Sequence, residues 1–273
     1  MEDVAARRDE RGITIQRVGV KEVHLPVQVR RKEGGYTQVL GRMDLSVELP
    51  HLHRGTHMSR LLDVLFRWVQ RPIASSDLVD ILEEACRRLH ARSAQMELAF
   101  KYFVEKRAPV SGIPSPLDYD CRFHGRLRDG DYVFTLGVEV PVTCLCPCSK
   151  EISRYGAHNQ RAMIRVNVRY GDKRIMWLED LIEQVERQGS APIYALLKRA
   201  DEKFVTEQAY ENPKFVEDML RDVVAVLHTD PRITWYQVEC ESIESIHNHS
   251  VYAYQQERRA NGEWQPTSEV EPC

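Results

Sequence analysis

The sequence of 273 residues lacks any apolar run that approaches the roughly 20 residues of a membrane-spanning helix. Its first twelve residues are strongly charged and have no apolar centre, so they do not have the pattern of a secretory signal. These two absences predict a protein that works in the cytoplasm and has no membrane partner.

The chain also lacks a strong excess of either charge. It has 38 Lys and Arg against 41 Asp and Glu, a formal net charge of −3. Because no global basic field exists, we expect no nucleic-acid partner, and an anionic ligand would need a local cluster of cationic groups. Hydrophobic residues make up 42% and charged residues 29%, which excludes disorder, collagen and coiled coil as the main architecture.

Spaced, paired cysteines are missing too. The seven cysteines are odd in number, and Cys144, Cys146 and Cys148 lie within five residues. A secreted disulfide framework needs paired cysteines in a small domain, and residues two apart do not easily meet disulfide geometry. In a reducing cytosol such a cluster indicates a metal ligand or a reactive thiol.

Strand-like and helix-like patterns follow one another along the chain in blocks. Helical periodicity predicts helices after His57 and over 77–92, 177–187 and 194–198, and a further helix is expected to begin at Asn212-Pro213, with Asn as the N-cap residue. Alternating apolar residues predict strands over 13–20, 27–49, 96–104, 119–127, 132–142, 164–170, 233–239 and 251–256.

The order of two strands, two helices and two strands occurs twice. It predicts a structural duplication with a boundary near Asp129-Gly130 and an α+β fold, in which antiparallel sheet carries helices on one face. We expect a flexible tail over 1–12, a first unit over 13–129, a second unit with most site residues over 130–260, and a loose C-terminal tail over 261–273.

The densest set of reactive side chains lies at 143–151, directly after a predicted strand. Pro147 cannot donate to a sheet ladder, so regular pairing should stop there, at a place where scaffolds display reactive groups. Lys150 lies near the thiols and favours the thiolate form. The alternative is that the three cysteines are small buried apolar residues.

Histidines form two further candidate segments. His158 lies twelve residues after Cys146 in a loop that contains Gly156, and thiolate with imidazole is a normal zinc ligand pair. His247 and His249 would share one face if their segment is extended, with Glu244 close by, a set that suits proton transfer or metal binding. An exposed polar edge strand is the alternative for this segment.

Two carboxylates complete the candidates. Glu202 follows a predicted helix, and Glu217 flanks the apolar stripe of the helix that begins at Asn212. Taken alone, each is most simply a solvated charge. A carboxylate at the edge of a buried face, as at Glu217, has the two acceptor oxygens needed to bind a pair of donors.

Four segments together resemble the prokaryotic type IB GTP cyclohydrolases. They are Pro-Val-Thr-x-Leu-Cys-Pro-Cys-Ser-Lys at 141–150, Gly-Ala-His-Asn-Gln-Arg at 156–161, Arg-Gly-Thr-His-Met-Ser-Arg at 54–60 and Glu-Ser-Ile-His-Asn-His at 244–249. The resemblance covers about 18–256. It implies a tandem (bimodular) tunnelling fold, the T-fold, whose two units lie in one chain that assembles into an oligomeric barrel as a homotetramer.

The resemblance also implies a reaction. GTP and water would give 7,8-dihydroneopterin triphosphate and formate, the entry to folate synthesis, with manganese, zinc or iron as the divalent metal. Carried over by motif, Cys146, His158 and Glu202 are the expected metal ligands, and Glu217 is the expected guanine anchor. The expected catalytic shell comprises Cys146, Cys148, Glu244, His247 and His249. Charge and nearness to the motifs make Lys150, Arg161, Arg54 and Arg60 the expected phosphate partners. Cys144 receives no role.

Two other functions stay open at this point. The chain could be another purine- or pterin-binding T-fold enzyme, of the nitrile reductase type, in which Cys148 is a nucleophile and no metal is needed. It could also be a non-catalytic protein whose Cys and His residues bind structural zinc, which normally has four protein ligands.

Overall fold

The computed structural model describes residues 5, 7–171 and 175–267. The chain divides into two compact units: unit 1 comprises Met1–Lys101 and Arg122–Leu136, and unit 2 comprises Tyr102–Cys121 and Gly137–Cys273. In the described ranges, no helix combines the length and the apolarity that crossing a membrane requires.

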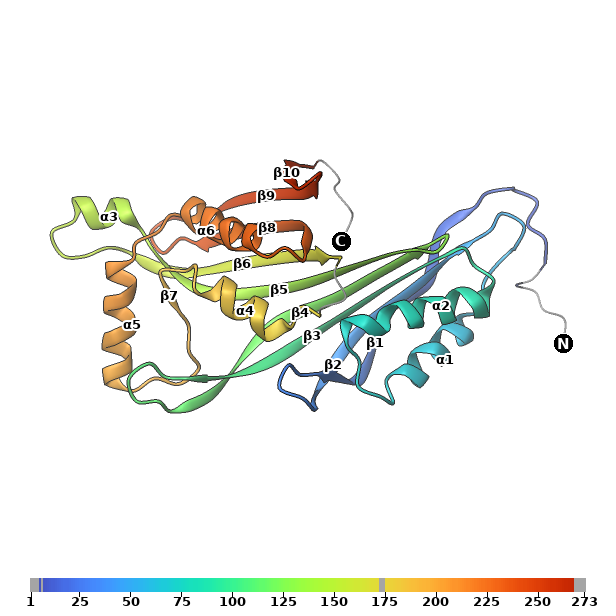
Figure 1. Ribbon diagram of the computed structural model, residues 1–273, viewed down its shortest axis with the longest axis horizontal. Coiled ribbons are helices and arrows are strands. Elements are labelled where there is room, and N and C mark those ends of the chain that lie inside the picture. The colour runs from blue at the N-terminus through green and yellow to red at the C-terminus, as the bar shows by residue number, and fades with distance from the viewer. Residues whose placement is uncertain (1–4, 6, 172–174, 268–273) are drawn as a thin grey trace. The chain divides into compact units, whose positions relative to one another are not determined.

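Long strands and short helices make up both units (Figure 1). The helices are α1 (Met58–Trp68), α2 (Leu78–Leu89), α3 (Pro147–Ile152), α4 (Leu178–Glu186), α5 (Arg199–Glu211) and α6 (Val216–Thr229), with a short 3-10 helix η1 (Ser75–Asp77). The strands are β1 (Ile15–Arg30), β2 (Tyr36–Leu49), β3 (Ser93–Arg107), β4 (Pro114–Arg128), β5 (Asp131–Leu145), β6 (Asn159–Tyr170), β7 (Ala191–Pro192), β8 (Ile233–Ile243), β9 (Ser250–Ala260) and β10 (Glu263–Pro266).

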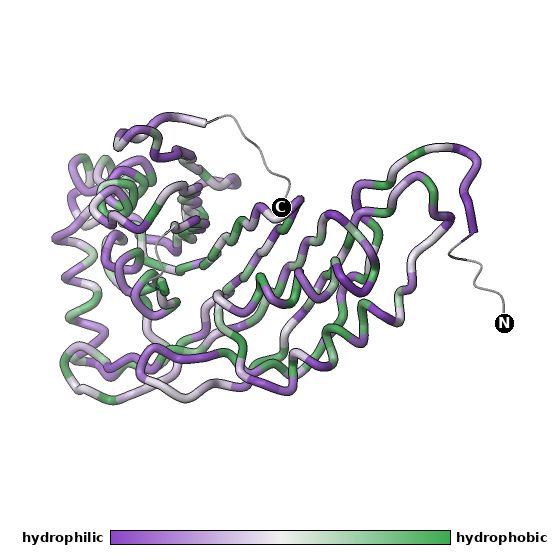
Figure 2. The backbone as a smooth tube through the Cα atoms, turned by 45° about the vertical axis from the view of Figure 1, so that its right-hand side comes forward, coloured by the Kyte–Doolittle hydropathy of each residue, from purple (hydrophilic) through white to green (hydrophobic). Residues whose placement is uncertain are grey.

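Unit 1 consists of an antiparallel sheet in the order β1-β2-β3-β4-β5 and the helices α1 and α2. The hairpin of β1 and β2 closes at Arg30 opposite Tyr36, and β2 pairs with β3. Residues along β2 alternate between buried and half-buried positions, so one face of the sheet packs into the core. Figure 2 shows how hydrophilic and hydrophobic residues follow one another along the backbone. The helices bury Leu61, Val64, Leu65 and Trp68 of α1 and Leu78, Ile81, Leu82 and Ala85 of α2.

Unit 2 has the strand order β3-β4-β5-β6-β8-β9-β10, with β7 paired to β5. α6 packs on β8 and β9 and also contacts α4. The strands bury one set of alternating residues, such as Val166 opposite Val238. The other set is polar: Arg165 Nη1 donates to Glu239 at 2.7 Å and to Glu241 at 2.8 Å. The predicted α+β class, antiparallel sheet with helices on one face, is confirmed.

The two compact units do not follow the predicted domain boundaries. β3, β4 and β5 each contribute residues to both units, because the division follows local contacts along these long strands. The predicted duplication into 13–129 and 130–260 is a statement about repeated element order, so it stays a prediction.

The region after α4 differs from the sequence-based expectation. Residues 194–198 are not helical, and α5, which follows them, was not predicted. α5 lacks an apolar stripe because Phe204 and Tyr210 are exposed and only Asp201 and Ala209 are buried. Asn212 is the C-cap residue of α5 and not an N-cap: its Nδ2 donates to the carbonyls of Gly189 and Ser190, both at 3.1 Å.

Both predicted tails are partly ordered in the described residues. The backbone N–H groups of Arg54 and Gly55 donate to the carbonyls of Arg7 and Ala5, so this end of the chain lies along the loop after β2. Residues 263–266 form β10 instead of a loose tail. Stacking holds β10 in place: the Trp264 ring lies 4.6 Å from that of His228. Residues 1–4, 6 and 268–273 of the predicted tails lie outside the described residues.

Glu257 joins β9 to its neighbours through one half-buried carboxylate. Its Oε2 accepts from Tyr236 Oη at 2.5 Å and lies 2.9 Å from His228 Nε2, and its Oε1 accepts from Gln255 at 2.9 Å. Burial raises the pKa of Glu257, but these hydrogen bonds outweigh burial, and the pKa lies below its usual value.

We predict that Glu257→Gln destabilises the protein. The amide would turn a donor toward Tyr236, which is fully buried, or toward His228. The free energy of unfolding at neutral pH should fall by about 1–2 kcal/mol. Because the folded-state pKa is lowered, the carboxylate stabilises the fold above the unfolded pKa of about 4.5, and this contribution is lost as the pH falls through the folded value. The free energies of unfolding of the two proteins, measured by urea denaturation, should therefore become equal in acid. Glu263→Gln, an exposed carboxylate of β10, is the control, and an equal effect there would refute the assignment.

Candidate active site

The thiol segment lies at the end of β5. The strand ends at Leu145, and Cys146 is the N-cap residue of α3, with Pro147 at the first helical position. The prediction that strand pairing stops at Pro147 is confirmed. The Cys146 thiol accepts a hydrogen bond from Ser149 N at 3.5 Å, and Cys148 is exposed.

The cysteine cluster is divided by the strand. Cys144 points into the core and donates to the carbonyl of Lys214 at 3.3 Å. Burial raises the pKa of the Cys144 thiol to about 11, although its contacts with Ser242 and Gln160 act in the opposite direction. The alternative of a small buried residue is therefore correct for Cys144, whereas Cys146 and Cys148 are accessible.

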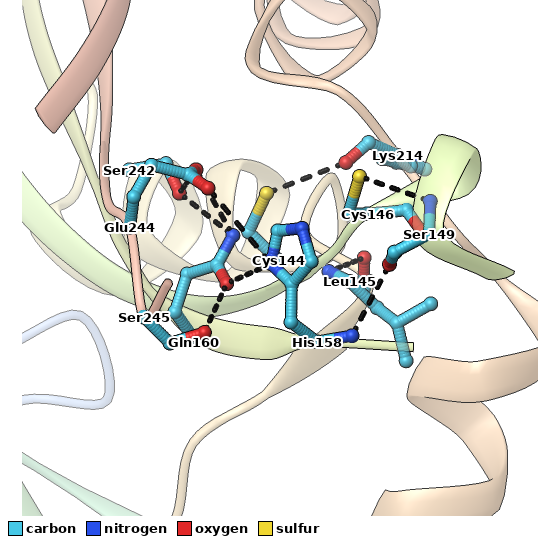
Figure 3. Close-up of polar contacts among 11 residues, drawn as sticks. Cys144, Leu145, Cys146, Ser149, His158, Gln160, Lys214, Ser242, Glu244 and Ser245 are labelled. Carbon is cyan, nitrogen blue, oxygen red and sulfur yellow. Dashed lines mark hydrogen bonds and ion pairs between the residues drawn. The ribbon is translucent and has the colours of Figure 1, made fainter. Parts of the chain in front are cut away.

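His158 lies beside Cys146 because their backbones are joined (Figure 3). Cys146 N donates to His158 O at 3.1 Å. Ser149 ties the same two segments together: its hydroxyl donates to Cys146 O and accepts from His158 N, both at 3.1 Å. A thiol and an imidazole twelve residues apart in sequence are thus carried on adjacent pieces of backbone.

A hydrogen-bond network links His158 to Glu244 (Figure 3). His158 Nδ1 lies 2.8 Å from Gln160 Oε1, and Gln160 Nε2 donates to Glu244 Oε1 at 3.1 Å and to Ser242 Oγ at 3.2 Å. Sequence reasoning assigned no role to Gln160 or Ser242. The available signal was closeness in sequence to a candidate residue. Gln160 lies two positions from His158, and Ser242 lies two positions from Glu244.

The two candidate histidines lie in the connection between β8 and β9. This segment is not an extended strand, so the geometry assumed for His247 and His249 was wrong. Their rings nevertheless stack, with centroids 5.2 Å apart and planes at 22°. Both side chains are exposed. The turn therefore brings the two imidazole rings together, as a strand was expected to do.

α5 and α6 carry the two candidate carboxylates. Glu202 is exposed in the first turn of α5, on the helix face that also carries Val205 and Ala209. These two residues pack against Leu145 and Ala157, the immediate neighbours of Cys146 and His158. Glu217 is exposed in the first turn of α6.

Asp201 anchors α5 through buried hydrogen bonds. Its Oδ1 accepts from the backbone N–H groups of Val110 and Ser111, both at 2.8 Å, and its Oδ2 accepts from Ser111 Oγ at 2.7 Å and Lys198 N at 2.9 Å. Burial raises the pKa of this carboxyl, but the hydrogen bonds lower it far more. The helix that holds Glu202 is therefore fixed to the turn between β3 and β4.

The expected phosphate partners differ in their surroundings. Lys150 Nζ donates to the carbonyl of Tyr210 at 2.5 Å and lies 4.4 Å from the centre of its ring. Its ammonium group is thus held by the end of α5. Arg161 is exposed on β6.

The expected metal ligands do not form a closed ligand group. In the part of the chain that the structure describes, no three His, Cys, Asp or Glu side chains converge as a metal site would require. The donor set itself fits a borderline divalent ion, because thiolate, imidazole and carboxylate are all ligands of zinc. Cys146 and His158 are already paired through their backbones, and Glu202 lies on α5, whose Val205 and Ala209 pack beside them.

Comparison with known proteins agrees with this set of segments. Residues 1–253 match the family described as type I GTP cyclohydrolase folE2. The chain belongs to this family. Among FolE2 relatives, the GTP cyclohydrolase of Geobacter sulfurreducens is 51% identical over 93% of this chain and 96% of its own, and that of Magnetococcus marinus is 50% identical over 93% and 95%. The relative from Geotalea uraniireducens is 47% identical and aligns over 100% of both chains.

The resemblance to the type IB enzymes is thereby confirmed, and membership of the FolE2 family argues against the nitrile reductase and structural-zinc alternatives. Solved structures extend the fold comparison. Uricase from Arthrobacter globiformis has a TM-score of 0.57 and covers 91% of this chain and 95% of its own, at 8% identity. At that identity the likeness concerns the fold alone, and it confirms the tunnelling fold expected for a FolE2 chain.

Proposed function

We propose that this FolE2 chain is a metal-dependent GTP cyclohydrolase that works in the cytoplasm. It converts GTP and water to 7,8-dihydroneopterin triphosphate and formate, the first step of folate biosynthesis. One observation carries the proposal: the family match includes the segments in which Cys146, His158 and Glu244 lie within one hydrogen-bonded region.

Cys146, His158 and Glu202 are the residues that would hold a divalent ion, with manganese, zinc or iron as candidates. Such an ion, when bound, lowers the pKa of a coordinated water toward about 7 and so supplies hydroxide. The adjacency of Cys146 and His158 supports two of the ligands. Packing of the Glu202 face of α5 against the residues beside them supports the third.

The side chains around the proposed metal ligands would carry out proton transfer. A histidine that protonates N7 of guanine makes C8 more electrophilic, and a second hydration after ring opening releases formate. His247 and His249 suit this work because imidazole titrates near neutral pH and their stacked rings are accessible. Glu244 and the exposed Cys148 complete the proposed catalytic shell.

Glu217 is the proposed guanine anchor. Its two oxygens can accept from the ring N1–H and the exocyclic amine, a bidentate match that adenine lacks. Its exposed position at the start of α6 leaves both oxygens open to a ligand. Lys150 and Arg161 are the proposed partners of the triphosphate, and Lys150 would exchange its bond to the Tyr210 carbonyl for phosphate.

Assembly is part of the proposal, as a homo-oligomer and most simply a tetramer. Unit 2 exposes large apolar side chains around the candidate site, which a monomer would leave in water. Their exposed fractions are 84% for Ile152, 91% for Tyr155, 64% for Ile246 and 71% for Tyr252. Burial of these side chains against other subunits would also bring further residues to the site.

The central test is turnover. Purified protein with GTP and added Mn²⁺, Zn²⁺ or Fe²⁺ should release formate and a fluorescent pterin product. Cys146→Ala should abolish both activity and bound metal, because the thiolate is a proposed ligand, while circular dichroism shows an intact fold. Full metal occupancy in Cys146→Ala would refute the ligand assignment. Cys86→Ala, a half-buried cysteine of unit 1, is the matched control and should keep its metal.

Guanine recognition can be tested separately. Glu217→Gln replaces one acceptor oxygen by a donor that faces guanine donors, which should weaken GTP binding by about 2–3 kcal/mol. Calorimetry with GTP measures this loss, and Asp218→Asn is the neighbouring control. Unchanged affinity of the Glu217 variant would exclude the anchor role.

The histidine pair should affect turnover and not binding. If one imidazole is a general acid, its substitution by Ala should reduce turnover by about 100-fold or more, and the pH–rate profile should lose a limb near pH 6–7. Metal content and GTP affinity should stay near those of the unaltered protein. His247→Ala and His249→Ala are made separately, and more than half of the activity in both would contradict proton transfer.

A further inference from the structure

Gln160 occupies the centre of the network between Glu244 and His158. It is the second residue of β6, and His158 lies directly before the first. Five groups surround its amide: the Cys144 thiol, His158 Nδ1 at 2.8 Å, Glu244 Oε1 at 3.1 Å, Ser242 Oγ at 3.2 Å and Ser245 Oγ at 3.3 Å. The amide is thus fully engaged.

The chemistry of these neighbours determines which way the amide points. An ionised carboxylate can only accept hydrogen bonds, so the amide nitrogen must face Glu244. The Ser242 hydroxyl donates to the same Glu244 oxygen at 3.0 Å and therefore has its lone pairs free to accept from the amide nitrogen. The amide oxygen is left to face His158, as Figure 3 shows.

The direction of the amide in turn determines the tautomer of His158. An amide oxygen can only accept, so the hydrogen of a neutral His158 imidazole must be on Nδ1. Glu244 does not bond to the ring directly, since its Oε2 lies 3.8 Å from Nδ1, beyond hydrogen-bond distance. The other ring nitrogen, Nε2, then has a lone pair and no proton.

We propose that Gln160 is a positioning residue, which holds His158 in the Nδ1–H tautomer and leaves Nε2 ready to ligate a divalent ion. It also transmits the negative charge of Glu244 to the ring through one amide. The backbone of His158 is already held by Cys146 and Ser149, so Gln160 supplies the remaining constraint, the orientation of the ring. The inference rests on His158 as a metal ligand of the proposed function.

The first experiment measures the tautomer without metal. Protein with ¹⁵N-labelled histidine is studied in metal-free form, and the two ring nitrogens of His158 are identified by long-range ¹H–¹⁵N correlation. We expect the Nδ1–H tautomer in the unaltered protein and its loss in Gln160→Leu. Gln160→Glu keeps an acceptor toward Nδ1. Its second oxygen would share one proton with Glu244, as carboxylates at this distance do, so this variant should restore the tautomer. An Nε2–H tautomer in the unaltered protein overturns the proposal, whatever the variants do.

The second experiment measures zinc affinity by competition with a chromophoric chelator, at the site that Cys146→Ala removes. Gln160→Leu should bind Zn²⁺ about 10- to 100-fold more weakly, because loss of such an outer partner has costs of this size. Gln160→Glu should recover most of the affinity. Ser245→Ala removes only the 3.3 Å bond to the same oxygen and should change affinity by less than about 2-fold.

The outcomes separate this proposal from the proposed function. Unchanged zinc affinity in Gln160→Leu, or equal losses in the Leu and Glu variants with an intact fold, would overturn the role of Gln160. An unaltered protein that binds Zn²⁺ but releases no formate from GTP would refute the cyclohydrolase proposal, and the tautomer would still decide the question for Gln160. An unaltered protein without a zinc site removes the basis of both.

Discussion

The candidate site depends on one backbone contact, the hydrogen bond between the end of β5 and the residue that precedes β6. Cys146 N donates to His158 O, and the Ser149 hydroxyl bonds to both residues. Pro147 ends the ladder at this point, so the thiol segment turns into α3 instead of continuing along the sheet. A thiol and an imidazole therefore come together on rigid backbone and not on a free loop.

The helix that carries Glu202 is held by a different kind of constraint. α5 has almost no apolar face, and its buried side chains are an aspartate and an alanine. Asp201 compensates by accepting four hydrogen bonds, three of them from the turn between β3 and β4. Polar contacts within unit 2 fix the position of this helix, and its Val205 and Ala209 then pack beside the segments of Cys146 and His158.

Unit 2 contains two polar networks with different roles. The group around Glu257 fastens β9 and β10 to α6 and stabilises the fold. The hydrogen bonds around Gln160 have a fixed direction. The Glu244 carboxylate can only accept, so the amide nitrogen donates to it and the amide oxygen faces the His158 imidazole. This direction is the basis for the proposed tautomer of His158.

The sequence by itself determined the elements with strong periodicity and the family, and through the family the candidate site residues. Alternation in β5, β6 and β8 and the stripe of α1 were readable, because burial of one face imposes a period of 2 or 3.6 on the side chains. Cys146, His158 and Glu244 were readable as a resemblance of four short segments. Tertiary structure alone decided the rest. α5 and β10 have no periodic signal, since Asp201 and Trp264 hold them by contacts distant in sequence. The bonds from Gln160 to Ser242 and Glu244 exist only because β8 lies beside β6.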